Sequence, residues 1–173
     1  MKNIITILTL LLSISSFAQN RQYLHGNWYF NQENTKEIYQ AKVPGTIHQD
    51  LMRAGLIDDI YFENNEHKYR WIEDENWEYT TSFSVDSNTY NYAVHNLVFE
   101  GIDTYGDVYL NDSLILEADN MFRTWRVDVH ELIKFGDNEL RIKFISPIKK
   151  NKEKPKNIEK INKVEILEEN KTT

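Results

Sequence analysis

Cysteine is absent from this sequence of 173 residues. Its absence excludes a disulfide framework, a thiolate zinc site and a lipid anchor on cysteine. A folded domain of this chain must therefore be stabilised by its apolar core. Aromatic residues make up 13% of the sequence, and large aromatic side chains supply much of the buried area of such a core.

Long apolar runs are also lacking, except at the start of the chain. Lys2 precedes an apolar segment from Ile4 to Leu12, which is followed by Ser16-Phe17-Ala18, a small-x-small cleavage site. This order is typical of a secretory signal peptide, and the segment is too short to span a membrane. We expect residues 1–18 to be a signal peptide and the mature chain to be a soluble protein exported to the periplasm or the extracellular space. An exported protein without cysteine fits the bacterial periplasm better than a eukaryotic secretory route.

Positive charge is scarce in the body of the chain. Residues 21–148 contain 11 lysines and arginines against 22 aspartates and glutamates, a net charge of −11. This balance argues against nucleic acid and against an anionic membrane surface as partners, because both repel an acidic protein. Residues 149–173 carry 8 lysines against 5 glutamates. One interpretation of this tail is a polyanion-binding arm, but the interspersed glutamates favour a charged linker or a solvated surface helix.

Short segments in which apolar and polar residues alternate fill most of the chain. Because successive side chains of a strand point to opposite faces, such alternation indicates half-buried strands. The most regular segment runs from Trp77 to Val85, and turn residues such as Gly101, Gly106 and Asp119-Asn120 separate the later ones. Those later segments place apolar residues at alternate positions: Leu97 and Phe99; Val108 and Leu110; Trp125, Val127 and Val129; Leu140, Ile142 and Phe144. The pattern predicts a mainly β fold over residues 19–148, an antiparallel β-sandwich or jelly roll.

The first third of the chain combines two strands with a helix. Residues 26–30 and 38–43 suit short strands, and Pro44-Gly45 ends the second one. Thr46 is a helix N-cap residue with Gln49 three positions later, as in a capping box, and Gly55 suits the left-handed position after the helix. The spacing therefore predicts a helix between Thr46 and Gly55.

Three smaller elements complete the prediction. Residues 65–72 suit a second short helix, and residues 86–91 suit a polar loop. A single helical turn is expected after Val129, with Asp128 as its N-cap and Glu131 at the third position.

Histidine and tryptophan are the residues most suggestive of a site. The five histidines have no His-x-x-x-His spacing, so we expect no metal centre: His25, His48, His67, His95 and His130. Tryptophan faces can stack on sugar rings, yet Trp77 and Trp125 fall on the apolar parity of their strands, which indicates the core. Trp71 is the best candidate for exposure, although packing is favoured for it as well.

Several of these segments resemble a known family. Motifs along about 110 residues look like the N-terminal sugar-binding domain of family 2 glycoside hydrolases, closest to the β-mannosidases. The matching motifs are Val43-Pro44-Gly45-Thr46-Ile47-His48 with Leu51, Gly55-Leu56-Ile57 and Asp58, Arg70-Trp71, Asn76-Trp77-Glu78-Tyr79, residues 97–105, Val108-Tyr109-Leu110-Asn111, Asp119-Asn120-Met121-Phe122 and Ser146-Pro147. Agreement over this length identifies a family more firmly than any single motif does.

The resemblance implies a galactose-binding-like jelly roll with one or two short helices, truncated before the catalytic (β/α)₈ barrel. Enzymes of this family carry both catalytic glutamates in that barrel, and a Trp-Asp-Trp-Gly-Pro motif that reaches the active site lies just past this type of domain. Among the acids of this chain, Glu73, Glu75, Glu78 and Glu100 do not lie in an Asn-Glu pair of the kind the family uses for its acid/base. We therefore assign no catalytic, cofactor-binding or metal-binding residue, and for His48, inside a family-like motif, a structural role is favoured over sugar contact.

Two functions remain as hypotheses. The first is the N-terminal domain of an exported β-mannosidase-like retaining hydrolase, which removes terminal β-D-mannose residues in carbohydrate catabolism and is inactive without its barrel. Its partners are the downstream barrel domain and β-mannoside glycans. The second is a stand-alone secreted module that binds a carbohydrate or a protein.

Overall fold

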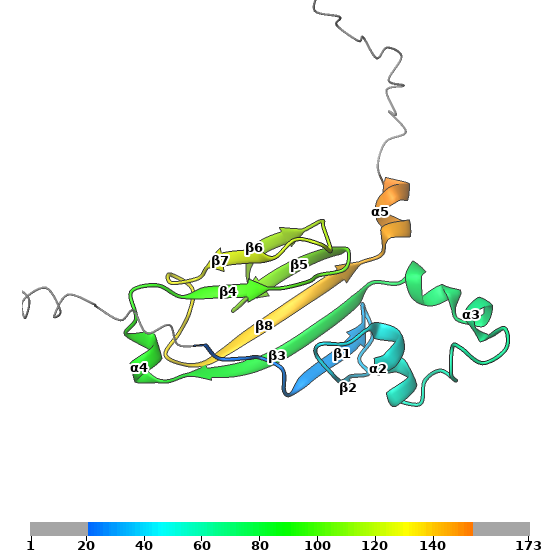
Figure 1. Ribbon diagram of the computed structural model, residues 1–173, viewed down its shortest axis with the longest axis horizontal. Coiled ribbons are helices and arrows are strands. Elements are labelled where there is room, and N and C mark those ends of the chain that lie inside the picture. Colours follow the sequence, from blue (N-terminus) through cyan, green and yellow to red (C-terminus); the bar gives the residue numbers. More distant parts are fainter. Residues whose placement is uncertain (1–20, 154–173) are drawn as a thin grey trace, which may run out of the picture.

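The computed structural model describes residues 21–153, so the expected signal peptide and residues 154–173 of the tail lie outside the described residues. A six-stranded antiparallel sheet, in the order β2-β1-β3-β8-β5-β6, forms one layer, and a two-stranded sheet, β4-β7, lies in the other (Figure 1). The strands are β1 Trp28–Gln32, β2 Tyr39–Ala41, β3 Trp77–Val85, β4 Asn96–Phe99, β5 Tyr105–Leu110, β6 Ser113–Ala118, β7 Trp125–Asp128 and β8 Gly136–Ile145. The mainly β antiparallel sandwich predicted from the alternation is confirmed.

Alternation along the strands decides which face of the large sheet is buried. In β3 the side chains of Trp77, Tyr79 and Thr81 are buried, whereas their neighbours on the other parity are not. Val108 and Leu110 of β5 are fully buried in the same way. The opposite face of the sheet remains in water, as expected for an antiparallel sheet packed on one side.

One apolar core lies between the large sheet and the elements that cover it. Phe30 of β1, Leu51 and Ile72 are almost fully buried in a single cluster. Leu97 and Phe99 of β4 pack against the same cluster, so the small sheet and the helical segment cover one face together. The core therefore joins the N-terminal third of the chain to the later strands.

Helix α2 (Ile47–Arg53) confirms the helix predicted after Pro44-Gly45. The Thr46 hydroxyl oxygen accepts a hydrogen bond from the backbone N–H of Gln49 at 3.4 Å, which satisfies one of the free donors of the first turn. Gly55 follows the helix with φ +70°, a conformation that glycine adopts without steric cost.

The second short helix differs from its prediction. Residues 65–72 were expected to form one helix, but the structure has α3 (Asn65–Lys68) followed by the 3₁₀ helix η2 (Arg70–Asp74). The two segments meet at Tyr69, whose hydroxyl donates to Asp58 Oδ2 at 2.7 Å and accepts from the Asp58 backbone N–H at 2.9 Å. We attribute the break to this tertiary contact, which holds Tyr69 in a conformation between two helical turns.

The polar loop predicted over residues 86–91 is wrong, because this segment contains the short helix α4 (Ser87–Tyr90). The Asp86 carboxylate caps it by accepting from the Thr89 backbone N–H at 2.7 Å. After Val129 the expected helical turn is present as a hydrogen bond from Ile133 N to Val129 O at 2.9 Å.

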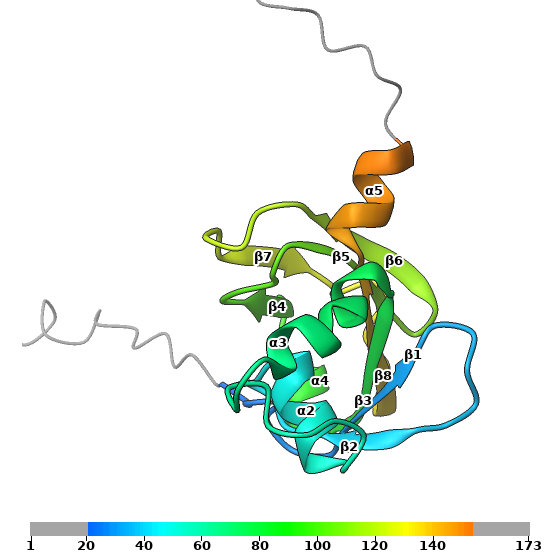
Figure 2. The same ribbon diagram turned by 90° about the vertical axis from the view of Figure 1, so that its right-hand side faces the viewer.

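The strand register defines one end of the sandwich, which we call the exit end. Gln32, Trp77, Phe144, Gly106 and Ala118 lie opposite one another in a row across the large sheet. Beyond this row lie the β1–β2, β4–β5 and β6–β7 connections, η2 before β3, and helix α5 (Pro147–Glu153) after β8. Figure 2 looks at this end, with α2 and α3 toward the viewer and α5 leaving it.

Helix α5 is fixed where the chain leaves the exit end. The Ser146 hydroxyl donates to the Glu73 carbonyl at 2.6 Å, and Lys149 Nζ lies 2.9 Å from Glu75 Oε2. The start of the tail is thus a surface helix attached to η2. None of the helices within residues 21–153 has the length and apolar character needed to cross a membrane.

Candidate functional site

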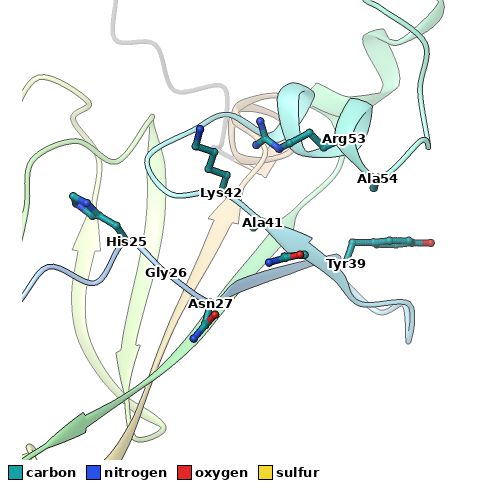
Figure 3. Close-up of a pocket in the computed structure, with 9 residues that line it drawn as sticks. His25, Gly26, Asn27, Tyr39, Ala41, Lys42, Arg53 and Ala54 are labelled. Carbon is teal, nitrogen blue, oxygen red and sulfur yellow. The ribbon is translucent and has the colours of Figure 1, made fainter.

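One surface hollow lies between the residues before β1, strand β2 and the end of α2 (Figure 3). Its volume is about 620 Å³. It is lined by His25, Gly26, Asn27, Tyr39, Gln40, Ala41, Lys42, Arg53 and Ala54. Figure 3 shows that its side chains do not converge, since Tyr39 points away from Lys42 and His25. The lining contains no carboxylate, so this hollow holds neither of the two acids that retaining glycoside hydrolysis requires.

The smaller hollow, of about 260 Å³, lies at the exit end and is aromatic. Its lining is Phe30, Gln32, Thr35, Glu37, Tyr39, Leu51, Leu56, Trp71 and Trp77. Trp71 leans on Trp77, with ring centroids 6.1 Å apart, and keeps 41% of its surface exposed. Glu37 is the single carboxylate of this lining. The hollow thus offers an apolar surface with a polar rim and no pair of acids.

Asp50 is the carboxylate that the fold buries completely. Its side chain is 0% exposed, and its oxygens accept from the backbone N–H of Lys42 at 2.9 Å, from the Tyr79 hydroxyl at 2.8 Å and from the guanidinium of Arg53. Burial raises the pKa of the Tyr79 hydroxyl, and the negative charge of Asp50 raises it further. The Tyr79 hydroxyl therefore keeps its proton and donates a hydrogen bond to Asp50. The Asp50 carboxylate in turn links helix α2 to the loop around Pro44 and to strand β3.

Glu33 and Lys143 form a half-buried ion pair that ties the β1–β2 connection to β8. The hydrogen bond from Lys143, with a second from Asn76 Nδ2 at 2.7 Å, lowers the pKa of Glu33. The Glu33 carboxylate in turn raises the pKa of Lys143. Both shifts favour the charged pair, so the pair stabilises the folded state at neutral pH.

This pair gives a pH-dependent prediction. A folded-state pKa of Glu33 below its unfolded value adds stability above that unfolded value, and the contribution is lost as the pH falls through the lowered pKa. Glu33→Gln should therefore reduce the free energy of unfolding at pH 7, by under about 1 kcal/mol, and the reduction should be smaller at pH 3. Urea unfolding at both pH values measures this. Glu37→Gln, an exposed neighbour, is the control; an equal loss at pH 3 and pH 7 would contradict the electrostatic origin.

The structure brings together two histidines that are 35 residues apart. His95 Nδ1 lies 3.0 Å from His130 Nδ1, and His95 Nε2 lies 2.8 Å from the Thr89 carbonyl oxygen. His95 is buried, with 8% of its surface exposed. Both of its ring nitrogens are thus engaged, and the pair joins the segment before β4 to the turn after β7. Within residues 21–153 no group of three or more His, Cys, Asp or Glu is placed to hold a metal ion.

The remaining residues singled out by sequence are dispersed. Trp77 is buried and Trp125 packs against the core, as their strand parity predicted. Trp71 packs against Trp77, and the rest of its ring is exposed to solvent. His48 lies on α2 and lines neither hollow. The structure therefore does not gather these residues into one site.

Comparison with known proteins gives the class to which this fold belongs. Residues 28–172 match the family described as "Glycosyl hydrolase 2 galactose-binding domain-like". The chain belongs to this family of galactose-binding-like domains of glycosyl hydrolase 2 proteins.

Several of its relatives are β-mannosidases. The chain is 35% identical to the β-mannosidase of Rattus norvegicus and 38% identical to that of Bos taurus, each over 125 residues that make up 72% of this chain and 14% of the relative. The crystal structure of the β-D-mannosidase from Dictyoglomus thermophilum matches 82% of this chain and 18% of its own with 40% identity and a TM-score of 0.79. The chain is thus an N-terminal domain of the β-mannosidase type, and it spans about one seventh of the curated relatives it matches.

Proposed function

We propose that this chain is the N-terminal domain of an exported β-mannosidase that hydrolyses terminal β-D-mannosides with retention, and that it is inactive by itself. The similarity to the Dictyoglomus thermophilum β-D-mannosidase, at 40% identity, carries the proposal. The apolar segment before Ala18 supports export.

The carboxylates that the reaction requires suggest that this domain supports catalysis and does not perform it. Retaining hydrolysis uses two carboxylates about 5 Å apart, one as nucleophile and one as general acid and base. The linings of the two hollows described above contain one carboxylate between them, Glu37. The catalytic pair is therefore assigned to the part of the enzyme that follows this domain. Two ion pairs, Lys143 with Glu33 and Lys149 with Glu75, hold the connections at the exit end, on which such a part can be positioned.

An activity assay tests the proposal. The purified chain should show no turnover of an aryl β-mannoside above background. A chimera in which this chain replaces the matching N-terminal domain of the Dictyoglomus thermophilum β-D-mannosidase should hydrolyse it, because the two domains share a fold at 40% identity. A variant of the chimera that lacks its catalytic glutamate is the control. Turnover by the chain alone, or a folded but inactive chimera, would contradict the proposal.

One observation favours a second function, that of a carbohydrate-binding module. Trp71 exposes part of its ring beside the polar side chains of Gln32 and Glu37 in the smaller hollow, and aromatic faces of this kind pack against sugar rings. Calorimetric titration of the chain with mannose and with β-manno-oligosaccharides separates the two functions. Binding that Trp71→Ala abolishes would support the module.

A further inference from the structure

The hollow between β2 and the end of α2 has no carboxylate in its lining, although the domain around it is acidic. The body of the chain carries 11 lysines and arginines against 22 aspartates and glutamates. The lining contains instead the cationic side chains of Lys42 and Arg53, with His25 as a third residue that can carry positive charge. Side chains of one sign that line a concave surface concentrate their field there. The hollow therefore favours an anionic ligand, in contrast to the rest of the domain.

Arg53 is held at the hollow by the buried Asp50. Its Nη2 donates to Asp50 Oδ1, and 44% of the Arg53 side chain remains exposed. A guanidinium has five N–H donors, so this contact leaves others for a ligand. Because Asp50 already fixes the head group, binding a ligand to it costs little side-chain entropy. Arg53 is thus a preorganised donor at the edge of the hollow.

Lys42 supplies the excess positive charge of the hollow. Its backbone N–H donates to Asp50 Oδ1 at 2.9 Å, and the same oxygen accepts from Arg53, so both residues contact one atom. Figure 3 shows the side chains of Lys42 and Arg53 on the same side of β2. The Lys42 side chain is exposed and takes part in none of the ion pairs of residues 21–153. Since the charge of Asp50 is paired with that of Arg53, the ammonium of Lys42 is left to bind an anion.

The size of the hollow and the rest of its lining indicate a ligand larger than an inorganic anion. Its volume is about 620 Å³, within the range of roughly 300–1,000 Å³ that is usual for small-molecule pockets. Gln40 and Asn27 add amide groups, which both donate and accept hydrogen bonds and so match hydroxyls. The ring of Tyr39 points away from Lys42 (Figure 3), so contact by hydrogen bonds is favoured over stacking. A polyhydroxylated molecule with one oxyanion fits this set of groups.

We propose that this hollow is a binding site for an acidic sugar, whose oxyanion is held by the Lys42 ammonium and the Arg53 guanidinium. The hydroxyls of the sugar bind to the amides of Gln40 and Asn27. Carboxylate and phosphate groups both suit this pair of cations, because the ammonium supplies a point charge and the guanidinium a planar set of donors. The inference goes beyond the proposed function, because it gives the domain a ligand of its own and holds or fails without a catalytic part.

Three pyranoses that differ only at their sixth carbon test the site. D-glucuronate carries a carboxylate there, D-glucose 6-phosphate a phosphate, and D-glucose no charge. Each is titrated into the isotope-labelled 173-residue chain, and nuclear magnetic resonance of the backbone amides measures the affinity and locates the contact. We expect the acidic sugars to shift the amides of His25, Gln40 and Lys42 saturably and to bind roughly tenfold more tightly than glucose. Added salt should weaken their binding, because it screens the charges.

Lys42→Gln removes the excess charge and is the decisive variant. It should weaken the binding of the acidic sugars roughly tenfold. The melting temperature should not change, because the hydrogen bond to Asp50 comes from the Lys42 backbone, which the variant keeps. Lys36→Gln is the matched control, since Lys36 is an exposed lysine outside both hollows and its replacement changes the net charge equally. This control should bind the acidic sugars as the unmodified chain does.

The possible results separate the site from its alternatives. Saturable binding of one acidic sugar and not the other would support the site and identify its anion. Inorganic phosphate that binds as tightly as D-glucose 6-phosphate would show that the sugar makes no contribution, and would overturn the inference. The same conclusion would follow if Lys42→Gln and Lys36→Gln weakened binding equally, if the shifted amides lay away from the hollow, or if neither acidic sugar shifted any amide.

Discussion

Asp50→Ala should destabilise the domain by about 3 kcal/mol, because the substitution removes a buried acceptor of hydrogen bonds and leaves a buried donor unpaired. The substitution leaves the guanidinium of Arg53 without its counter-charge and the buried Tyr79 hydroxyl without its acceptor. It also frees the Lys42 backbone N–H, which fixes the loop before α2. Because small domains have only about 5–15 kcal/mol of stability, the variant should unfold at a much lower urea concentration.

Two further variants separate charge from geometry at Asp50. Asp50→Asn keeps an oxygen acceptor of the same shape and should lose less stability than the alanine variant. Asp137→Ala removes an exposed carboxylate from β8 and should change the free energy of unfolding by no more than about 0.5 kcal/mol. An Asp50→Ala variant as stable as Asp137→Ala would show that the network does not hold α2 on the sheet.

Phe30→Ala should also cost about 3–5 kcal/mol, through the cavity it leaves in the core. Phe30 is 1% exposed and its ring contacts those of Tyr39, Tyr79 and Trp77 at centroid distances of 5.7, 5.7 and 6.2 Å. These neighbours lie on paired strands, so they have little freedom to collapse into the space. Chemical unfolding followed by tryptophan fluorescence measures the loss.

Tyr29 is the matched control for Phe30, because it is the next residue of β1 and points to the wet face of the sheet, where it is 49% exposed. Tyr29→Ala should cost under about 1 kcal/mol. Phe30→Leu, which keeps most of the apolar volume, should fall between the two alanine variants. Equal losses for Phe30→Ala and Tyr29→Ala would mean that this core position is not tightly packed.

Strands were the part of the fold that could be predicted from the sequence. Trp77–Val85 was predicted with its exact bounds, because one face of β3 is buried and the period of two then appears directly in the residues. Thr46 and Gly55 marked the ends of α2 for an equally local reason, since both act on backbone groups within a few residues of themselves. Elements whose form depends on contacts with residues farther along the chain were predicted less well. The break between α3 and η2 at Tyr69, which contacts Asp58, is an example.

The candidate site was less accessible to sequence reasoning. The sequence does carry a signal at Asp50, because this residue lies on the apolar face of α2 with Ile47, Leu51 and Ala54. A carboxylate at such a position requires buried partners. His95 and His130 carried no signal, because 35 residues separate them.

The sequence by itself determined the antiparallel strands, the helix after Pro44-Gly45 and, through its motifs, the family. These properties depend on the order of side chains along a few residues, which is what a sequence records. Only the tertiary structure decided that Asp50 links α2 to β3, that His95 meets His130, and that Trp71 packs on Trp77 beside a hollow. Contacts of this kind depend on register and packing between segments far apart in the chain, and local alternation does not specify them.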